Sequence, residues 1–496
     1  MNKNYLLPAS GQVGRTSEGA SHRGALHFPK CDAPGGLLRP YPAYKDSGVP
    51  WLGEIPAHWE LRKTKYLFRE RSEKGFPDEP HLAATQTKGV VRTEDYENRT
   101  VLALKDLHLL KLVRIGDFVI SLRSFQGGIE IARHQGIISP AYTILYPINP
   151  EYQPFFGALF KSAPYIQNLS LYVTGIRQGQ NIDYQKLSNS ILPVPPPAEQ
   201  RAIAAFLDTH DRLTRHYIHA QQRLIKLLTE QKQALIQQAV TRGLDPNVPL
   251  KDSGIEWLGK IPAHWETLRA KYVFREIDDR SATGSETLLS MSQKLGLVPS
   301  YRIEERRLLS VSYAGAKLCQ KDDLVLNRLK AHLGVFALAS EPGIVSPDYT
   351  VLRAARPICP RYFELILRTP ACRTELCKRV KGIVQGFWRL YTEEFYGIVL
   401  PFPPLEEQWK IVEHLDIQLQ SLNETITRIQ SQIVLVREYR TRLIADVVTG
   451  KLDVRGFEVG RTSESASHPE DAAWENLEDE ETGDALDDLD VDADGE

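Results

Sequence analysis

Residues 45–70 read KDSGVPWLGEIPAHWELRKTKYLFRE, and residues 251–276 read KDSGIEWLGKIPAHWETLRAKYVFRE. Eighteen of these 26 positions are identical at an offset of 206 residues. Repeats of about 20 to 50 residues build solenoids, whereas a period of this length is that of a whole domain. The sequence therefore predicts a duplicated domain, a single chain built as a pseudo-dimer.

Further landmarks recur inside the two copies. SPAYTIL at 139–145 matches SPDYTVL at 346–352, and GIRQG at 175–179 matches GIVQG at 382–386. Between the landmarks the copies differ strongly, which is expected if they do the same task on different targets, although unconstrained drift would look similar. In the first copy, β-branched or apolar runs predict strands at 89–92, 117–122 and 137–146. An apolar run predicts a helical stretch at 155–169.

Each copy ends in a proline-rich hinge that leads into a long helix. LPVPPPAEQ at 192–200 opens the first helix and LPFPPLEEQ at 400–408 the second. Proline is tolerated at the start of a helix, and Glu there suits the positive end of the helix dipole. Glycine in TRGLD (241–245) and TGKLD (449–453) predicts where the helices stop.

The second helix carries an apolar seam with a seven-residue period. One set of seam positions is Val412, Leu419, Ile426, Ile433 and Val447, and the other is Leu415, Leu422, Ile429, Val436 and Leu443. This is a coiled-coil pattern of about six heptads, broken only by Arg440. The first helix is less regular: Leu207, Ile218, Ile225, Leu228, Leu235 and Ala239 fall on the seam, as do Asp211, Thr214 and Lys232.

Two apolar stripes in one chain pack most simply on each other. If duplication relates the halves by a two-fold axis, the helices run antiparallel and the globular units lie at opposite ends. We therefore expect an α+β fold with two mixed globular domains separated by an antiparallel two-helix coiled coil, with pseudo-two-fold internal duplication. The predicted divisions are a flexible leader (1–40), a first domain (41–197), a helix (198–243), a second domain (244–404), a helix (405–450) and a disordered acidic tail (451–496).

Composition restricts the class of protein. The chain has 496 residues, of which 42% are hydrophobic and 25% charged, as in ordinary soluble proteins. No apolar run approaches the roughly 18 to 20 residues of a membrane span, and the N-terminal apolar segment is too short for a signal peptide. Five cysteines without a CxxC pair fit reduced thiols, so a cytoplasmic location is expected.

The charge of the chain is unevenly distributed. Residues 470–496 hold 14 Asp and Glu and no Lys or Arg, so the rest carries 61 basic against 49 acidic residues. A basic body permits polyanion binding. Acidic blocks are most often solvated tails, and the alternative here is a tail that shields a DNA-binding face.

The order of domain and PPxxEQ-led helix, given twice with WLGxIPxHW at 51–59 and 257–265, resembles the specificity subunit of type I restriction-modification systems. The resemblance covers about residues 41–455. It implies two target-recognition domains, each reading one half of a bipartite, asymmetric site in double-stranded DNA. It further implies that the helices set the gap between half-sites and dock two modification (methyltransferase) subunits. A restriction/translocase subunit would complete the enzyme, and S-adenosylmethionine, ATP and Mg would bind to the partners.

Base readout requires donors and acceptors on loops that reach base edges, such as Arg for guanine and Asn or Gln for adenine. Segments at 121–128, 175–181, 326–332 and 382–389 supply such side chains, and all but 326–332 contain glycine. The predicted DNA-binding residues are Arg123, Gln126, Arg177, Gln178, Gln180 and Asn181 in the first copy, and Arg328, Lys330, Gln385 and Arg389 in the second. Taken singly, each is better explained as part of a solvated surface loop, whereas the set of paired loops in a predicted DNA reader favours DNA binding.

Catalytic motifs are not found. GIEWLGKI at 254–261 has Ile where a phosphate loop needs Ser or Thr, and NPEY at 149–152 lacks the second proline of an adenine methyltransferase turn. No HExxH, zinc-spaced Cys/His set or Gly-x-Ser-x-Gly occurs. His58 and His264, each between Ala and Trp, are interpreted as packed structural residues.

Two other classes of protein remain open at this point. A coiled-coil scaffold without DNA binding would fit the seam and the near-neutral net charge of −2. Duplex binding that weakens steeply with salt would exclude it. A self-sufficient DNA-modifying or DNA-cleaving enzyme would need activity in the purified chain alone, and the missing motifs disfavour it.

Overall fold

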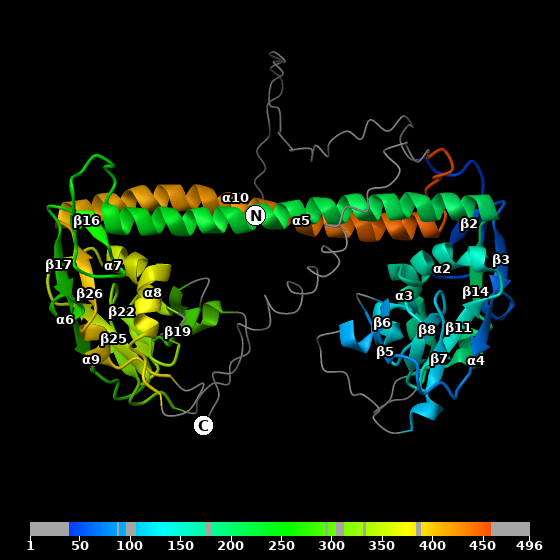
Figure 1. Cartoon of the computed structure of the whole chain (residues 1–496), viewed down its shortest axis with the longest axis horizontal. Coiled ribbons are helices and arrows are strands. Elements are labelled where there is room, and N and C mark those ends of the chain that lie inside the picture. The colour runs from blue at the N-terminus through cyan, green and yellow to red at the C-terminus, as the bar shows by residue number, and fades with distance from the viewer. Residues whose placement is uncertain are drawn as a thin grey trace, which may run out of the picture. The chain divides into compact units, whose positions relative to one another are not determined.

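The structure of the chain, a computed structural model, describes residues 39–86, 89–95, 106–174, 181–292, 296–303, 312–330, 334–382 and 388–457. The chain divides into two compact units (Figure 1). Unit 1 comprises Met1–Asp211 and Arg440–Glu496, and unit 2 comprises Arg212–Tyr439. Each unit thus combines one globular part with segments of both long helices. We call residues 39–196 head 1 and residues 243–404 head 2.

Head 1 is built around a four-stranded antiparallel sheet in the order β4-β11-β8-β9. Smaller antiparallel pairs surround it: β1-β2, β3-β14, β5-β6, β7-β10 and β12-β13. The strands are β1 (Tyr44–Asp46), β2 (Glu54–Pro56), β3 (Glu60–Lys63), β4 (Phe68–Arg71), β5 (Leu82–Thr85), β6 (Gly89–Arg92), β7 (Lys111–Val113), β8 (Phe118–Ile120), β9 (Glu130–Ile131), β10 (Gly136–Ile138), β11 (Thr143–Pro147), β12 (Val173–Thr174), β13 (Asn181–Ile182) and β14 (Ile191–Val194). The helices are α1 (Ser124–Gly127), α2 (Gln153–Phe160), α3 (Ala163–Leu169) and α4 (Tyr184–Leu187).

Head 2 repeats this plan with a sheet in the order β18-β25-β22-β23. Its smaller pairs are β15-β16, β17-β26, β19-β20 and β21-β24. The strands are β15 (Leu250–Asp252), β16 (Lys260–Pro262), β17 (Glu266–Arg269), β18 (Phe274–Ile277), β19 (Leu289–Ser292), β20 (Gly296–Pro299), β21 (Lys317–Cys319), β22 (Leu324–Asn327), β23 (Phe336–Leu338), β24 (Gly343–Val345), β25 (Tyr349–Ala354) and β26 (Val399–Phe402). The helices are α6 (Ala270–Val273), α7 (Pro360–Leu367), α8 (Pro370–Cys377) and α9 (Thr392–Tyr396). The α+β class and the internal duplication are thereby confirmed.

The two long helices are α5 (Pro197–Arg242) and α10 (Leu405–Val448), of 46 and 44 residues. Both end where the sequence predicted, each followed within two residues by a glycine with positive φ, +76° at Gly243 and +79° at Gly450. Only glycine adopts this backbone conformation without strain, so it ends the helix. At Gly450 a Cβ would also lie 2.3 Å from the Cδ of Pro56, so the end of α10 packs directly on the opening repeat of head 1.

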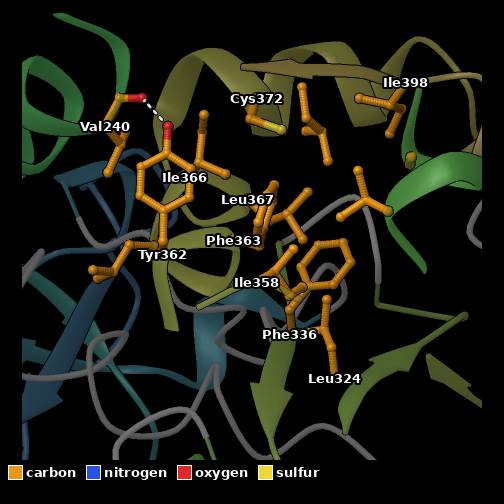
Figure 2. Packing of buried hydrophobic residues seen from close by; sticks show 14 of the residues in the cluster. Val240, Leu324, Phe336, Ile358, Tyr362, Phe363, Ile366, Leu367, Cys372 and Ile398 are labelled. Carbon is orange, nitrogen blue, oxygen red and sulfur yellow. Dashed lines mark hydrogen bonds between the residues drawn. The ribbon is translucent and has the colours of Figure 1, made fainter. Parts of the chain in front are cut away.

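In each unit the core joins the sheet of the head to the long helices. In unit 2, α7 and α8 lie between the strands and the long helices (Figure 1), and Tyr362 of α7 donates a hydrogen bond of 2.8 Å to the carbonyl of Val240 in α5 (Figure 2). Phe363 and Ile366 are fully buried in the same cluster. In unit 1 the core includes Phe206 of α5 and Val447 of α10. Apolar burial thus fixes each head to helix segments.

Two sequence predictions about local structure are corrected. The helical stretch expected at 155–169 is two helices, because α2 ends at Phe160 and α3 begins at Ala163, after Ser162. The proline next to Ala163 fits a first helical turn but lacks the N–H that a continuing helix needs. The strand expected at 137–146 is likewise two strands, β10 and β11, separated by a turn in which the N–H of Tyr142 donates to the carbonyl of Ser139.

Unit 1 is assembled from two separated parts of the chain. After α10 the segment 451–457 returns to head 1, where the N–H of Asp453 donates a 2.8 Å hydrogen bond to the carbonyl of Arg39. Val454 of the same segment is buried in the core of head 1. In unit 2 the chain runs directly from α5 to β15. The predicted leader (residues 1–38 of it) and most of the predicted acidic tail lie outside the described residues.

Candidate nucleic-acid interface

The segment between β8 and β9 presents two of the predicted DNA-binding side chains. Arg123 precedes α1 and Gln126 lies within it, and both are exposed. The hydroxyl of buried Ser124 accepts a hydrogen bond of 2.8 Å from the N–H of Ser121, which closes the turn. Arg123 and Gln126 therefore project from a short, internally bonded loop.

A buried carboxylate stands before the first residue of β8 and of β22. In head 1, Asp117 accepts from the Nε of Arg71 at 2.7 Å, and in head 2, Asp323 accepts from the Nε and Nη2 of Arg353 at 2.8 and 2.7 Å. The hydrogen bond to Asp323 raises the pKa of Arg353. Charge-assisted pairs of this kind are rigid, so each loop begins from a fixed strand.

In head 2 the predicted DNA-binding residues are more constrained by contacts within the head. Arg328 donates from Nε to the hydroxyl of buried Thr350 at 2.9 Å, and its Nη2 lies 3.9 Å from Glu276. Lys330 is half-buried, and Arg389 is exposed on a backbone bridge to Lys381. Arg328 therefore supports the fold of head 2 in the described conformation, whereas Arg123 of head 1 does not show such contacts among the described residues.

Several predicted residues cannot be placed. Arg177, Gln178, Gln180 and Gln385 lie outside the described residues. Asn181 contributes its backbone to β13, paired with Thr174, and its side chain is not described. These residues stay predictions.

The seam positions of the long helices are buried or half-buried. On α10, Leu415, Leu419, Ile429, Ile433, Val436 and Leu443 are buried, and Leu422 and Ile426 are half-buried. On α5, Leu207 is buried and Ile218, Ile225, Leu228 and Leu235 are half-buried. This burial pattern fits the expected coiled coil, which remains a prediction.

Polar residues on the predicted seam or directly beside it contact one another. In unit 1, Arg440, the interruption of the second helix, forms an ion pair with Asp211, an interruption of the first. In unit 2, Lys232 donates to the Oδ1 of Asn423 at 2.7 Å. Burial, reinforced by Arg361 and Arg368, lowers the pKa of Lys232. Polar pairs on an apolar seam fix helix register, so these contacts specify how α5 and α10 align within each unit.

The glutamate of each PPxxEQ motif bonds to the opening repeat of its own head, a contact that the sequence analysis missed. The carboxylate of Glu199 accepts from His58 Nε2 at 2.7 Å, from Trp59 Nε1 at 2.9 Å and from the Tyr41 hydroxyl. Burial and the hydrogen bond to Glu199 raise the pKa of Tyr41. In unit 2, Glu407 pairs with His264 Nε2 at 2.8 Å. The signal for this contact was available, because His-Trp and Glu-Gln occur in both copies.

The described part of the chain lacks two kinds of feature. It contains no cluster of three or more His, Cys, Asp or Glu that could hold a metal ion. Among the same residues, no helix combines the length and apolar character that crossing a membrane requires.

Comparison with known proteins finds similar chains. No protein-family model matches the chain. The type I restriction enzyme MjaVIII specificity subunit of Methanocaldococcus jannaschii is 22% identical over 293 residues, which cover 56% of this chain and 65% of that protein. The putative type I restriction enzyme MjaX specificity subunit of the same organism is 20% identical over 437 residues, covering 82% of this chain and 96% of that protein. The resemblance to type I specificity subunits is confirmed.

A solved structure agrees with this resemblance at the level of the fold. A chain from a structure described as the basis of complex assembly and conformational transition of the type I R-M system superposes with a TM-score of 0.60 at 16% identity. The match covers 80% of this chain and 99% of that one. The shared fold therefore extends over most of the chain and is not confined to the repeated motifs. The match to the MjaVIII subunit spans just under two thirds of that protein's length.

Proposed function

We propose that this chain is the DNA-recognition subunit of a type I restriction-modification complex, in which each head reads one half of a bipartite, asymmetric site. The observation that carries the proposal is the paired architecture. The same antiparallel sheet occurs twice, and the same strand, β8 or β22, leads in each head into a polar loop of different sequence. A fixed frame with variable loops is what two readers of unlike sequences require.

The chain is proposed to read DNA and not to modify it. The sequence lacks a methyltransferase or phosphate-binding motif, and the described residues hold no metal cluster. Methyl transfer, ATP hydrolysis and cleavage are assigned to the modification and restriction/translocase subunits, which would bind S-adenosylmethionine, ATP and Mg. The purified chain alone is expected to bind its duplex with an affinity that falls as salt rises, because phosphate contacts release counterions.

The long helices are proposed to set the gap between the half-sites and to dock the methyltransferase subunits. Large apolar side chains remain exposed on them, including Leu213, Leu224 and Leu227 on α5 and Trp409 and Ile417 on α10. Leu213, Leu224 and Leu227 are spaced by eleven and three residues, so they share one face of α5. Exposed apolar stripes on otherwise polar helices are typical of partner interfaces.

The test is to map methylated adenines in DNA from cells with and without this chain, in the presence of its modification subunits. A two-part motif with a fixed gap that appears only with the chain is the expected result. It reports both half-sites and their spacing. Methylation independent of the chain, or confined to a continuous motif, would contradict the proposal.

A further inference from the structure

A half-buried lysine holds the base of the exposed loop of head 1, residues 121–128. Lys161 is the residue directly after α2, and its Nζ donates to the carbonyls of Gly127 at 2.9 Å and Gln86 at 3.0 Å. The same Nζ lies 2.5 Å from the Oε1 of Glu130 in β9. One side chain thus joins the end of α1, the end of the β5 segment and the sheet. Arg123 and Gln126 sit on the α1 segment that it holds.

The packing around this lysine leaves the loop little freedom. A Cβ on Gly128 would lie 2.4 Å from the carbonyl oxygen of Phe160, and one on Gly127 would lie 2.8 Å from the Cγ of Gln86. Gly128 also has a φ of +87°, which favours glycine. The backbone after α1 therefore contacts the end of α2 directly, and a change in the position of Lys161 would be transmitted to the loop.

The carboxylate that accompanies Lys161 is buried. The side chain of Glu130 is 3% exposed, that of Lys161 is 34% exposed, and the Oε2 of Glu130 has no hydrogen-bond partner within the described ranges. A buried carboxylate is costly unless a cation compensates it. Burial of this pair carries a desolvation cost, and the pair lies at the base of a loop that is proposed to meet DNA.

Head 2 places a cation at the equivalent position with different partners. Arg368 is the residue directly after α7, as Lys161 is after α2, and its Nη2 donates to the carbonyl of Phe336 at 2.6 Å. Phe336 is the first residue of β23 and follows the loop that contains Arg328 and Lys330. Arg368 forms an ion pair with Glu364 at 3.0 Å. In head 1, Glu130 stands opposite Val119 in the sheet, and the equivalent residue of head 2, opposite Val325, is Ala337.

We propose that Lys161 and Arg368 are positioning residues for DNA recognition. Each fixes the segment that follows β8 or β22 in its own head, which we call the recognition loop, and so determines how well one half-site is discriminated. This inference rests on the proposed function. Loop side chains read bases only when their backbone is held in place, and in both heads a cation that follows the same helix bonds to a carbonyl of the loop or of the strand that follows it. The different carboxylate partners allow each loop to be set independently.

The experiment maps methylated adenines for the full chain with its modification subunits, comparing wild type with Lys161→Met and Arg368→Met. In Lys161→Met we expect methylation at sites with altered bases in one half to rise at least about tenfold, the scale of one lost base contact. The other half should be read as in wild type. Arg368→Met should relax the opposite half, and each variant therefore serves as the control for the other.

Conservative variants separate positioning from general stability. Lys161→Arg and Arg368→Lys keep the charge and the donors, and are expected to restore most of the discrimination at unchanged melting temperature. Wild-type discrimination of both halves in both Met variants would overturn the inference, as would equal loss in both halves. A wild-type chain that directs no two-part methylation would instead overturn the proposed function itself. If Lys161→Met does not accumulate as folded protein, Arg368→Met decides the matter in head 2.

Discussion

The junction between head and helix differs between the two units although the same motifs build both. In unit 1, Glu199 at the start of α5 accepts hydrogen bonds from Tyr41, His58 and Trp59, and it is 4% exposed. In unit 2, Glu407 at the start of α10 accepts one from His264. The position of Tyr41 is taken by Asn247 in the second copy. The Nε1 of Trp265 is buried without a hydrogen-bond partner among the described residues.

The comparison indicates that the same motif can contribute different amounts to the free energy of unfolding in the two units. A carboxylate that satisfies several buried donors is costly to remove, because each donor is then left unsatisfied. A half-exposed pair contributes little, because water replaces it. Unit 1 should therefore depend on its glutamate far more than unit 2 does.

The largest expected effect tests this directly. Glu199→Ala should lower the free energy of unfolding by about 3 kcal/mol or more, since Tyr41 and Trp59 would lose a buried acceptor. The matched variant Glu407→Ala should cost about 1 kcal/mol or less. The measurement is chemical denaturation followed separately for each unit by hydrogen exchange. Equal losses in the two variants would refute the contrast.

The seam of unit 2 provides the next test. Ile426→Asp places a charge in an apolar layer and should destabilise the helix pair by about 3 kcal/mol. It should also disturb the gap between half-sites or the assembly with the modification subunits. The control is Val434→Asp on the same helix, where the side chain is 54% exposed. Unchanged assembly and unchanged site selection in Ile426→Asp would show that the seam is assigned wrongly.

Glu130 gives head 1 a pH dependence that Ala337 cannot give head 2. Burial raises the pKa of Glu130 from 4.5 to about 7, although Lys161 acts in the opposite direction. Between about pH 4.5 and 7 the folded chain therefore binds a proton that the unfolded chain has lost, and the unfolding free energy falls as pH rises through this window.

Glu130→Gln should remove that fall, which is at most about 3 kcal/mol. The variant should gain stability relative to wild type on going from pH 5 to pH 8, measured by urea denaturation at both values. Glu94→Gln, at a side chain that is 69% exposed, is the control and should show no such gain. A difference between wild type and Glu130→Gln that is independent of pH would contradict the assignment.

The smallest effects concern Arg123 and Arg328, in the loops that are proposed to read DNA. Arg328→Ala should weaken binding of the correct site by about 1 to 3 kcal/mol if the side chain contacts a base, and should also destabilise head 2, because Thr350 and Glu276 lose a partner. Arg123→Ala should weaken binding by a similar amount without loss of stability. Fluorescence binding assays on matched and altered duplexes test both. Equal weakening on all sequences would identify a phosphate contact instead.

Features set by local chemistry could be predicted from the sequence. Strand β6 coincides with the expected 89–92, the glycines after α5 and α10 stop both helices, and the seam positions are buried or half-buried. Features that depend on tertiary partners could not be predicted. The break at Ser162, the acceptor role of Glu199 and the contacts of Lys161 with Gly127 depend on which distant segments meet. For the predicted DNA-binding residues, a list of loop donors could be drawn up, but the sequence did not indicate that Arg328 is bonded within its own head.

The division of unit 1 into two chain segments has a consequence for biosynthesis. Unit 2 is one continuous stretch, Arg212–Tyr439, whereas the core of head 1 includes Leu443, Val447 and Val454, which are synthesised some hundreds of residues later. Contacts between such remote segments form slowly, since a long loop must close first. We therefore expect the core of head 1 to be completed only after the last helix has been synthesised. We expect pulse-labelled hydrogen exchange during refolding to show protection of unit 2 before that of unit 1.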